Sequence, residues 1–272
     1  MALNESDFRS YITAFNRSNF DGFSCYYSPN VEFRGRAGQC TGREEVVRFY
    51  RNVRARVRET ITIHAVVVGE HAIVADLETE LYGLVDWPDL KTGPLKRGET
   101  RRSQNFIWYD IADDHFIRIR SAHYRYLATD EVAPDTIARP DIGMTADRFA
   151  AYIDAFNRDD YASFGDFYQD DVVLTIAGKR ELRGRQAILD FYRAVKSQTK
   201  RTIEINNVVT AGNQLAAELQ SEFVALQDLP DFAAGPMKKG GRIFINTVVL
   251  YELNDGKFSR IRSAELQKIH RA

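Results

Sequence analysis

The chain repeats itself at an almost constant spacing. Four segments recur in the same order about 142 residues later: FRSYITAFNRSNF (8–20) as FAAYIDAFNRDDY (149–161), GREEVVRFYR (42–51) as GRQAILDFYR (184–193), DWPDLKTGPLKRG (86–98) as DLPDFAAGPMKKG (228–240), and RIRSA (118–122) unchanged at 260–264. A spacing shared by four segments indicates a tandem duplication of a whole folding unit. We therefore expect a first domain at 1–128, a proline-containing linker at 129–144 and a second domain at 145–272.

Each copy begins with helical patterns and ends with strand patterns. Phe8, Tyr11, Ile12 and Phe15 have the spacing of one apolar helical stripe, and the second copy repeats it. Ser6 and Thr145 are expected to cap these first helices. A second short helix, a short strand and a third helix should follow, and then four long strands, which in the first copy are 60–68, 72–85, 101–111 and 115–127. This order favours an α+β domain with helices on one face of a curved antiparallel sheet.

Composition excludes several classes of protein. Lys plus Arg number 37 and Asp plus Glu number 38, so no global charge would attract nucleic acid or an anionic membrane. The sequence has neither a secretory leader pattern nor a long apolar run, and we expect a cytoplasmic protein. Cys25 and Cys40 are interpreted as free thiols. The histidines lack metal-ligand spacing and no phosphate-binding glycine motif is present, so we expect no metal and no cofactor. Homo-oligomerisation is left open.

Several segments carry a family resemblance. YITAFN (11–16), YSPNVEF (27–33), the GREEVVRFY helix and the RIRSAHY strand resemble the nuclear transport factor 2-like superfamily, in particular its SnoaL-like polyketide cyclases, scytalone dehydratases and ketosteroid isomerases. The resemblance implies two tandem cone-shaped domains, each with N-terminal helices packed on a curved sheet. It does not by itself fix a function, because members range from enzymes to binding modules.

The resemblance also assigns places to single residues. Tyr11 and Tyr152 align with the tyrosine that ketosteroid isomerases use as an oxyanion donor, whereas the base position falls on Phe33 and Leu174, which cannot take a proton. Steroid-type isomerase chemistry is therefore not supported. On the last strand of the first copy, the alignment points His123 into the cone, together with Ile119 and Ser121. The second copy has Ile261, Ser263 and Glu265 at these places.

The first copy holds more titratable candidates and is favoured as the reactive one. The catalytic candidates are Tyr11, His123, Glu32 and Arg34. The candidates for contacting a substrate are Tyr27, Phe33, His64, Tyr152 and Tyr168. An imidazole can give or take a proton near neutral pH, and a phenol can donate to a developing oxyanion. For His123 the alternative is a purely local hydrogen bond.

Two further patterns have competing interpretations. Asp76, Glu78 and Glu80 alternate on one strand, and we favour the outer face for them because three carboxylates inside a closed cone would be costly. The proline-bearing segment 86–98 is expected to be a hairpin connection rather than a strand. Its Lys96 and Arg97 are interpreted as solvent-exposed, the alternative being a rim over the mouth of the cone.

These observations favour a cofactor-independent acid–base lyase that acts on a small hydrophobic, aromatic substrate. One example of this class is the removal of formaldehyde from a lignin-derived diarylpropane. In that scheme His123 or Glu32 takes a proton while Tyr11 or Arg34 steadies the oxygen anion. The alternatives are a dehydratase or isomerase/cyclase of a polyketide-like substrate, and a non-catalytic pseudo-dimer that binds a ligand.

Overall fold

A computed structural model describes residues 3–36, 38–128, 130–131 and 143–271. The chain divides into two compact units, Met1–Ile137 and Ala138–Ala272. Most of the expected linker at 129–144 lies outside the described residues. The first domain comprises α1 (Glu5–Asn16), α2 (Phe20–Ser24), β1 (Tyr27–Gly35), β2 (Gly38–Thr41), α3 (Arg43–Arg54), β3 (Val57–Val68), β4 (Ala72–Gly83), β5 (Thr100–Ala112) and β6 (His115–Leu127). The second comprises α4 (Ala146–Asn157), α5 (Tyr161–Gly165), β7 (Tyr168–Ile176), β8 (Arg180–Arg183), α6 (Arg185–Lys196), β9 (Thr199–Ala211), β10 (Gln214–Ala225), β11 (Arg242–Asn254) and β12 (Lys257–Arg271).

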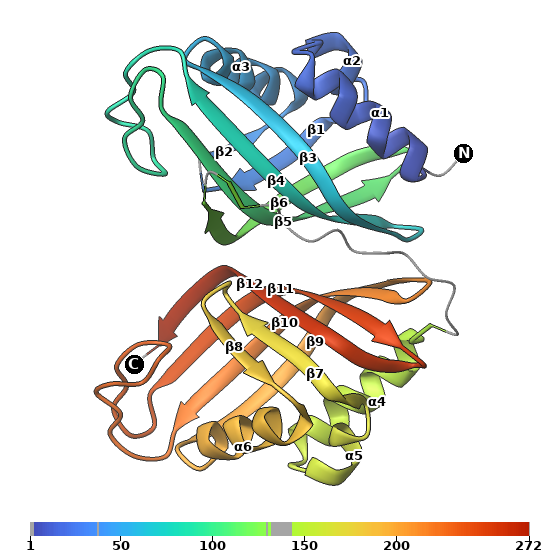
Figure 1. The fold of residues 1–272 in the computed structure, drawn as a ribbon, viewed down its shortest axis with the longest axis vertical. Helices are drawn as coiled ribbons and strands as arrows, with labels where there is room; N and C mark the ends of the chain where they lie inside the picture. Colours follow the sequence, from blue (N-terminus) through green and yellow to red (C-terminus); the bar gives the residue numbers. More distant parts are fainter. Residues whose placement is uncertain (1–2, 37, 129, 132–142, 272) are drawn as a thin grey trace. The chain divides into compact units, whose positions relative to one another are not determined.

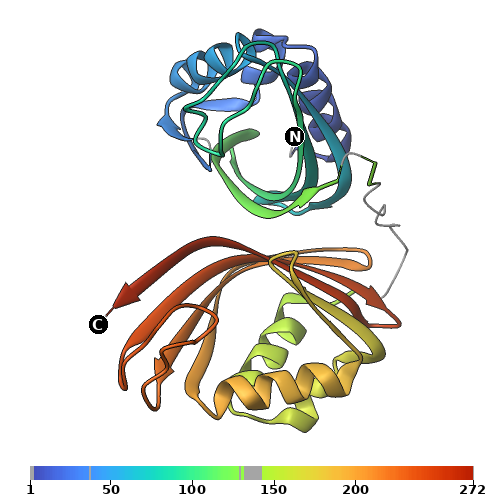
Figure 2. The same ribbon diagram turned by 60° about the vertical axis from the view of Figure 1, so that its left-hand side comes forward.

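The two domains share one topology, which confirms the expected duplication and α+β fold class. In the first domain the strands are ordered β2-β1-β6-β5-β4-β3, and every pair except the parallel β1/β6 pair is antiparallel. The second domain has the matching order β8-β7-β12-β11-β10-β9, with β7 and β12 parallel. Each sheet curves around the helices of its own domain (Figures 1 and 2).

The first helix of each domain buries its apolar stripe as predicted. Phe8, Tyr11, Ile12 and Phe15 are buried on α1, and their counterparts are buried on α4. The cap of α1 differs from the expectation. Asn4 rather than Ser6 caps it, since Asn4 accepts hydrogen bonds from the backbone N–H groups of Ser6 and Asp7, and the Asp7 carboxylate accepts one from Asn4 N–H. Thr145 caps α4 by accepting from Arg148 N–H at 3.2 Å, as expected.

The asparagine of the repeated AFNR motif has a structural role. Asn16 Nδ2 donates to the Ile61 carbonyl at 2.8 Å, and Asn16 Oδ1 accepts from Ile61 N–H at 2.8 Å. Asn157 makes the same two bonds to Ile203 in the second domain. This side chain therefore links the first helix to the edge strand of the sheet. The two hydrogen bonds fix the position of the edge-strand backbone relative to that helix.

The repeated proline-bearing segment is a hairpin connection, as predicted. Trp87 and Leu95 exchange two backbone hydrogen bonds across segment 86–98, and Leu229 and Met237 do so in the second copy. Leu95 is buried in a small cluster that includes Val57 at the start of β3. The segment thus folds back onto its own domain instead of extending into solvent.

Asp76, Glu78 and Glu80 lie on the face of the sheet opposite the domain interior, because Thr79 and Leu81, which alternate with them on β4, face inward. Gln104 donates to the Asp76 carboxylate at 2.8 Å, and Arg102 donates to Glu78 at 2.7 Å. His64 lies 3.2 Å from Glu78. The outer-face interpretation is confirmed. Hydrogen-bond donors on the same face offset the desolvation cost of the buried Asp76 and Glu78 carboxylates.

No helix in the described part of the chain is long and apolar enough to span a membrane.

Candidate functional site

A cavity of about 330 Å³ lies in the first domain, between the curved sheet, α1, α3 and segment 86–98. This volume is within the range of small-molecule sites. Its inner wall is aromatic, with contributions from the buried Tyr11, Phe15, Phe33 and Tyr109 and the half-buried Tyr50. Alternate residues of β4, β5 and β6 face it, as the period of a strand requires. Such a lining suits an apolar, ring-containing molecule.

One carboxyl group faces this aromatic wall. Glu59 projects from β3 into the cavity between Val57 and Ile61, which share its face of the strand. Its Oε2 atom is buried and has no hydrogen-bond partner among the described residues. Burial raises the pKa of Glu59 from the ordinary 4.5 to about 7, although the nearby charge of Arg54 opposes the shift. Near neutral pH the group therefore exists as both acid and carboxylate, which is the state a general acid–base catalyst needs.

Arg54 holds the backbone beside this carboxyl group. Its guanidinium donates to the Phe15 carbonyl at 2.8 Å and to the Glu59 carbonyl. Since both bonds end on backbone oxygens, Arg54 joins α3, α1 and β3 without donating a hydrogen bond to the Glu59 carboxylate. The arrangement positions Glu59 while its Oε2 atom keeps no hydrogen-bond partner among the described residues.

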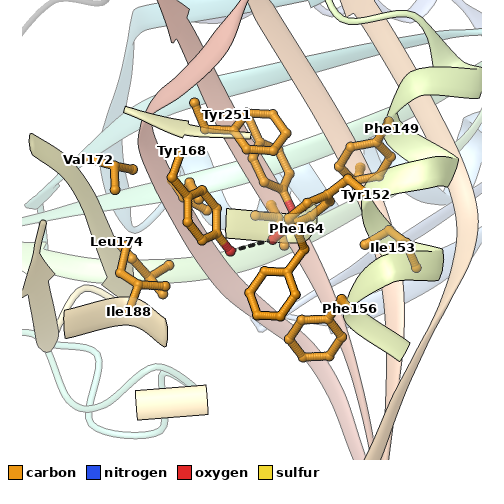
Figure 3. Close-up of a cluster of buried hydrophobic side chains, with 14 of the residues drawn as sticks. Phe149, Tyr152, Ile153, Phe156, Phe164, Tyr168, Val172, Leu174, Ile188 and Tyr251 are labelled. Carbon is orange, nitrogen blue, oxygen red and sulfur yellow. Dashed lines mark hydrogen bonds between the residues drawn. The ribbon is translucent and has the colours of Figure 1, made fainter. Parts of the chain in front are cut away.

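Tyr11 reaches the cavity as a protonated phenol. Its hydroxyl lies 2.9 Å from the Tyr27 hydroxyl. Burial, followed by the neighbouring Tyr27, holds the pKa of Tyr11 well above its ordinary value, so Tyr11 can donate a hydrogen bond but cannot serve as a base. Tyr152 and Tyr168 form the same pair at 2.8 Å in the second domain, where Figure 3 shows it within the core. The pair is thus a shared feature of the fold, and only the Tyr11 copy borders this cavity.

His123 lines the cavity, together with Asn105 and Tyr126. The inward facing of Ile119, Ser121 and His123 on β6 is therefore confirmed. His123 Nδ1 lies 3.4 Å from Asn105 Oδ1, and its ring centre lies 4.7 Å from that of Tyr126. These residues form a polar patch on an otherwise apolar wall.

A β-bulge explains why Tyr126 shares a face with His123. Asn105 pairs with His123, but the preceding Gln104 pairs with Arg125, so one residue of β6 is skipped. A bulge reverses the alternation beyond it. Tyr126 is turned inward by this irregularity, which strand periodicity alone does not predict.

Two of the proposed catalytic residues do not reach the cavity. Glu32 and Arg34 are exposed on β1, whereas Val31 and Phe33, which alternate with them, are buried, and Phe33 lines the cavity. Alternation along the strand sends the two charged side chains to the opposite face. The structure therefore gives no support to a catalytic role for either residue at this cavity.

The proposed substrate-contacting residues are similarly divided. Phe33 lines the cavity, and Tyr27 lies behind Tyr11 as its hydrogen-bond partner. His64 is on the outer face of the sheet beside Glu78. Tyr152 and Tyr168 belong to the second domain and contribute to its core. Of these five residues, Phe33 alone is part of the cavity lining.

Segment 86–98 closes one side of the cavity through residues other than those expected. Trp87, Asp89, Leu90, Lys91 and Thr92 line it, whereas Lys96 and Arg97 are exposed and do not. Arg101 on β5 fastens the segment by donating to the carbonyls of Thr92, at 3.2 Å, and Gly93, at 3.0 Å. The residues of segment 86–98 that border the cavity thus all lie in its first half.

The second domain has a cation where the first has its carboxyl group. Arg201 pairs with Phe223, as Glu59 pairs with Leu81. The guanidinium lies over the rings of Phe156, Tyr192 and Phe223 at 4.9 to 5.3 Å, and donates to Ser221 Oγ. A cation held by aromatic faces cannot act as a base, and Glu265, at the place of His123, is exposed. This geometry favours the first domain as the reactive one.

Within the described residues, no group of three or more His, Cys, Asp or Glu side chains is placed to hold a metal ion. Cys25 is exposed, and neither it nor Cys40 forms a disulfide.

Comparison with known proteins identifies a family for both domains. The SnoaL-like domain family matches residues 8–119 and, a second time, residues 149–261. No curated protein matches the chain significantly. Among solved structures, the chain is similar to an LEH-like epoxide hydrolase of M. tuberculosis (15% identity, 43% of this chain and 78% of that one, TM-score 0.36). It is also similar to a SnoaL-like polyketide cyclase of Agrobacterium tumefaciens (22% identity, 43% of this chain and 87% of that one, TM-score 0.36). A third similar structure is SalBIII, an epoxide hydrolase/cyclase-like enzyme of pyran ring formation in salinomycin (21% identity, 43% of this chain and 86% of that one, TM-score 0.36).

Proposed function

Because the chain belongs to the SnoaL-like domain family through both of its domains, we propose that its first domain is a cofactor-independent acid–base lyase. Its substrate is a small aromatic molecule, and Glu59 is the base. One observation carries the proposal: Glu59, a carboxyl group with a pKa of about 7 whose buried Oε2 has no hydrogen-bond partner among the described residues, lines an aromatic cavity. Maintaining such a group costs folding free energy, and perturbed carboxyl groups in clefts are concentrated at active sites.

The reaction class that we propose is fragmentation of a 1,2-diarylpropane-1,3-diol. The Glu59 carboxylate takes the proton of the terminal hydroxyl group, and the adjacent carbon–carbon bond breaks to release formaldehyde. The electron pair of that bond forms a double bond between the two aryl-bearing carbons, and the benzylic hydroxyl group leaves as water after receiving a proton. The products are one diarylethene, one formaldehyde and one water, so neither an oxidant nor a reductant is needed.

We assign the proton that the benzylic hydroxyl group needs in order to leave to the polar patch of His123, Asn105 and Tyr126. His123 gives the departing hydroxyl group its proton, and Tyr126 packs against the imidazole ring. The Tyr11 phenol stays protonated and donates toward oxygen anions at the buried wall. An acid and a base on different strands of one apolar cavity permit concerted proton transfer to and from the two hydroxyl groups of the diol.

The test is a product assay with a matched pair of variants. The protein is incubated with a 1,2-diarylpropane-1,3-diol, and formaldehyde and diarylethene are both quantified. We expect equal amounts of the two from the wild type, a loss of at least about a hundredfold in Glu59→Gln, and an unchanged rate in Arg201→Gln. Arg201→Gln is the control because it alters the equivalent position of the other domain.

The products also separate the competing reactions. An alkene formed without formaldehyde would indicate a dehydratase, and an isomeric product would indicate an isomerase or cyclase. Ligand binding without turnover, or a Glu59→Gln variant as active as the wild type, would contradict the proposal and favour a binding module.

A further inference from the structure

The opening of the first-domain cavity is rich in cations, and we infer from it that the substrate is an aromatic carboxylate whose charged end stays at the opening. This inference rests on the proposed function, since it concerns the substrate of the same cavity. Arg36, Arg56 and Lys91 all line the cavity and are all exposed. Asp89 is the one exposed acid among the lining residues, so the opening carries a net positive charge.

The three cations come from separate segments that meet around the cavity. Arg36 follows β1, Arg56 follows α3, and Lys91 lies in segment 86–98. None of the three forms a salt bridge with another residue in the described part of the chain. No carboxylate of the described residues therefore pairs with these three charges, and a ligand carboxylate can do so.

Aromatic contacts orient two of these side chains. The Arg56 guanidinium lies 5.0 Å from the ring centre of Trp87. Arg36 donates to the Tyr126 hydroxyl at 3.3 Å and lies 5.7 Å from the ring centre. Since Trp87 and Tyr126 also line the cavity, each guanidinium is held beside a surface on which an aromatic ligand would pack.

The second domain carries less of this charge. Gln198 follows α6 at the place of Arg56, and Ala233 stands in the second hairpin segment at the place of Lys91. The turn between β7 and β8, the counterpart of the turn that holds Arg36, has Gly178 at the equivalent position and keeps one exposed cation, Lys179. Two of the three cations therefore have no counterpart in the copy that has Arg201 in place of Glu59.

Electrostatics also gives the ligand an orientation. A cleft with low-dielectric walls concentrates the field of charges at its opening and draws an anion toward it. Glu59, which is less exposed than the three cations, repels a second carboxylate from the interior once it ionises. The carboxylate of the ligand therefore stays at the opening, and its neutral aromatic body enters the cavity.

Calorimetry with 4-methoxycinnamate and its neutral methyl ester tests this inference in the full-length protein. We expect the carboxylate to bind about tenfold more tightly than the ester at low ionic strength, with the preference reduced by salt. Arg56→Gln combined with Lys91→Ala copies the second domain and should reduce the preference to less than about twofold, with little change in ester affinity. Lys96→Ala combined with Arg97→Ala removes the same charge from exposed positions outside the cavity and should retain the preference.

Equal or tighter binding of the ester by the wild type, no binding of either probe, or an equal loss in the control variant would overturn the inference. Its failure is distinguishable from failure of the proposed function. Glu59→Gln should bind 4-methoxycinnamate at least as tightly as the wild type, because it removes a negative charge, even though turnover is lost. If turnover instead survived in Glu59→Gln while the probe preference held, the proposed function alone would be rejected.

Discussion

Glu59 and Arg201 occupy the same register position in the two domains, the first paired with Leu81 and the second with Phe223 on the neighbouring strand. A carboxyl group and a guanidinium thus point into equivalent interiors with opposite charge. The guanidinium lies over three aromatic rings and donates to Ser221 Oγ, although its Nε atom, like Glu59 Oε2, is buried without a hydrogen-bond partner among the described residues. The duplication has produced one interior with a cation held by aromatic faces and one with a carboxyl group beside an aromatic cavity.

The unsatisfied carboxyl group should make the stability of the first domain depend on pH. The folded-state pKa of Glu59 is about 7, above its ordinary 4.5, so the folded protein holds this proton more tightly than the unfolded chain does. Stability is therefore greatest below the unfolded pKa and is lost as pH rises through the folded pKa. Glu59→Gln cannot ionise and therefore avoids this loss. At alkaline pH we expect its free energy of unfolding to exceed that of the wild type by up to about 3 kcal/mol.

Urea unfolding of the first-domain transition at about pH 5 and pH 8 measures this effect. The exposed Glu265→Gln is the control and should change neither value. A stability difference between wild type and Glu59→Gln that is the same at both pH values would show that the carboxyl group is not perturbed by burial.

The two tyrosine pairs permit a matched comparison of structure and function. Tyr11→Phe and Tyr152→Phe each remove one buried hydroxyl–hydroxyl bond, and each should cost its domain about 1 kcal/mol in thermal unfolding. Only Tyr11 borders the cavity, so Tyr11→Phe should also lower turnover by roughly tenfold, whereas Tyr152→Phe should leave it unchanged. Equal turnover in the two variants would assign Tyr11 a purely structural role.

Arg101 is expected to control the mobility of the cavity wall. Its bonds to the Thr92 and Gly93 carbonyls fasten segment 86–98, and the second domain has Ile243 at this position. Arg101→Ile should therefore speed amide hydrogen exchange within the segment and raise KM several-fold, because a loosened wall must be ordered again on binding. Lys96→Ala, on the same segment but outside the cavity, should alter neither. Unchanged exchange in Arg101→Ile would show that the segment is held by its apolar contacts alone.

The fold could be predicted from the sequence because its evidence is redundant. Four repeated segments, the helical stripe ending in Phe15 and the strand-like runs were all legible, and each corresponds to an element of the structure. The exact start of α1 could not be predicted in this way. Asn4 is the N-cap instead of Ser6, because Asn4 and Asp7 form a capping box.

The site was predicted only in part, for reasons that depend on strand alternation. Tyr11, Phe33 and His123 were assigned to the cavity, where they lie, but Glu32 and Arg34 point away from it because they alternate with Val31 and Phe33. Glu59 was overlooked although it shares a face with Val57 and Ile61, and an acid at an apolar position of a strand was the available signal.

Two other cavity residues carried no such signal. Tyr126 faces inward because of a bulge in β6, and a bulge leaves no mark in a simple alternation. Trp87 reaches the cavity because segment 86–98 folds back onto its own domain, a tertiary contact that turn residues do not specify. Local patterns therefore give the elements, whereas the cavity depends on how they pack.

The central claim, that Glu59 is the base, is tested most directly by the pH dependence of kcat/KM for cleavage of the diol. Only the carboxylate form of Glu59 can accept a proton, so kcat/KM should have a limb that rises with pH and is centred near the Glu59 pKa of about 7. A second limb that falls at higher pH would report the general acid, His123. The rising limb should be absent from the residual activity of Glu59→Gln. A limb centred near the ordinary 4.5, or the same limb in Glu59→Gln, would contradict the account.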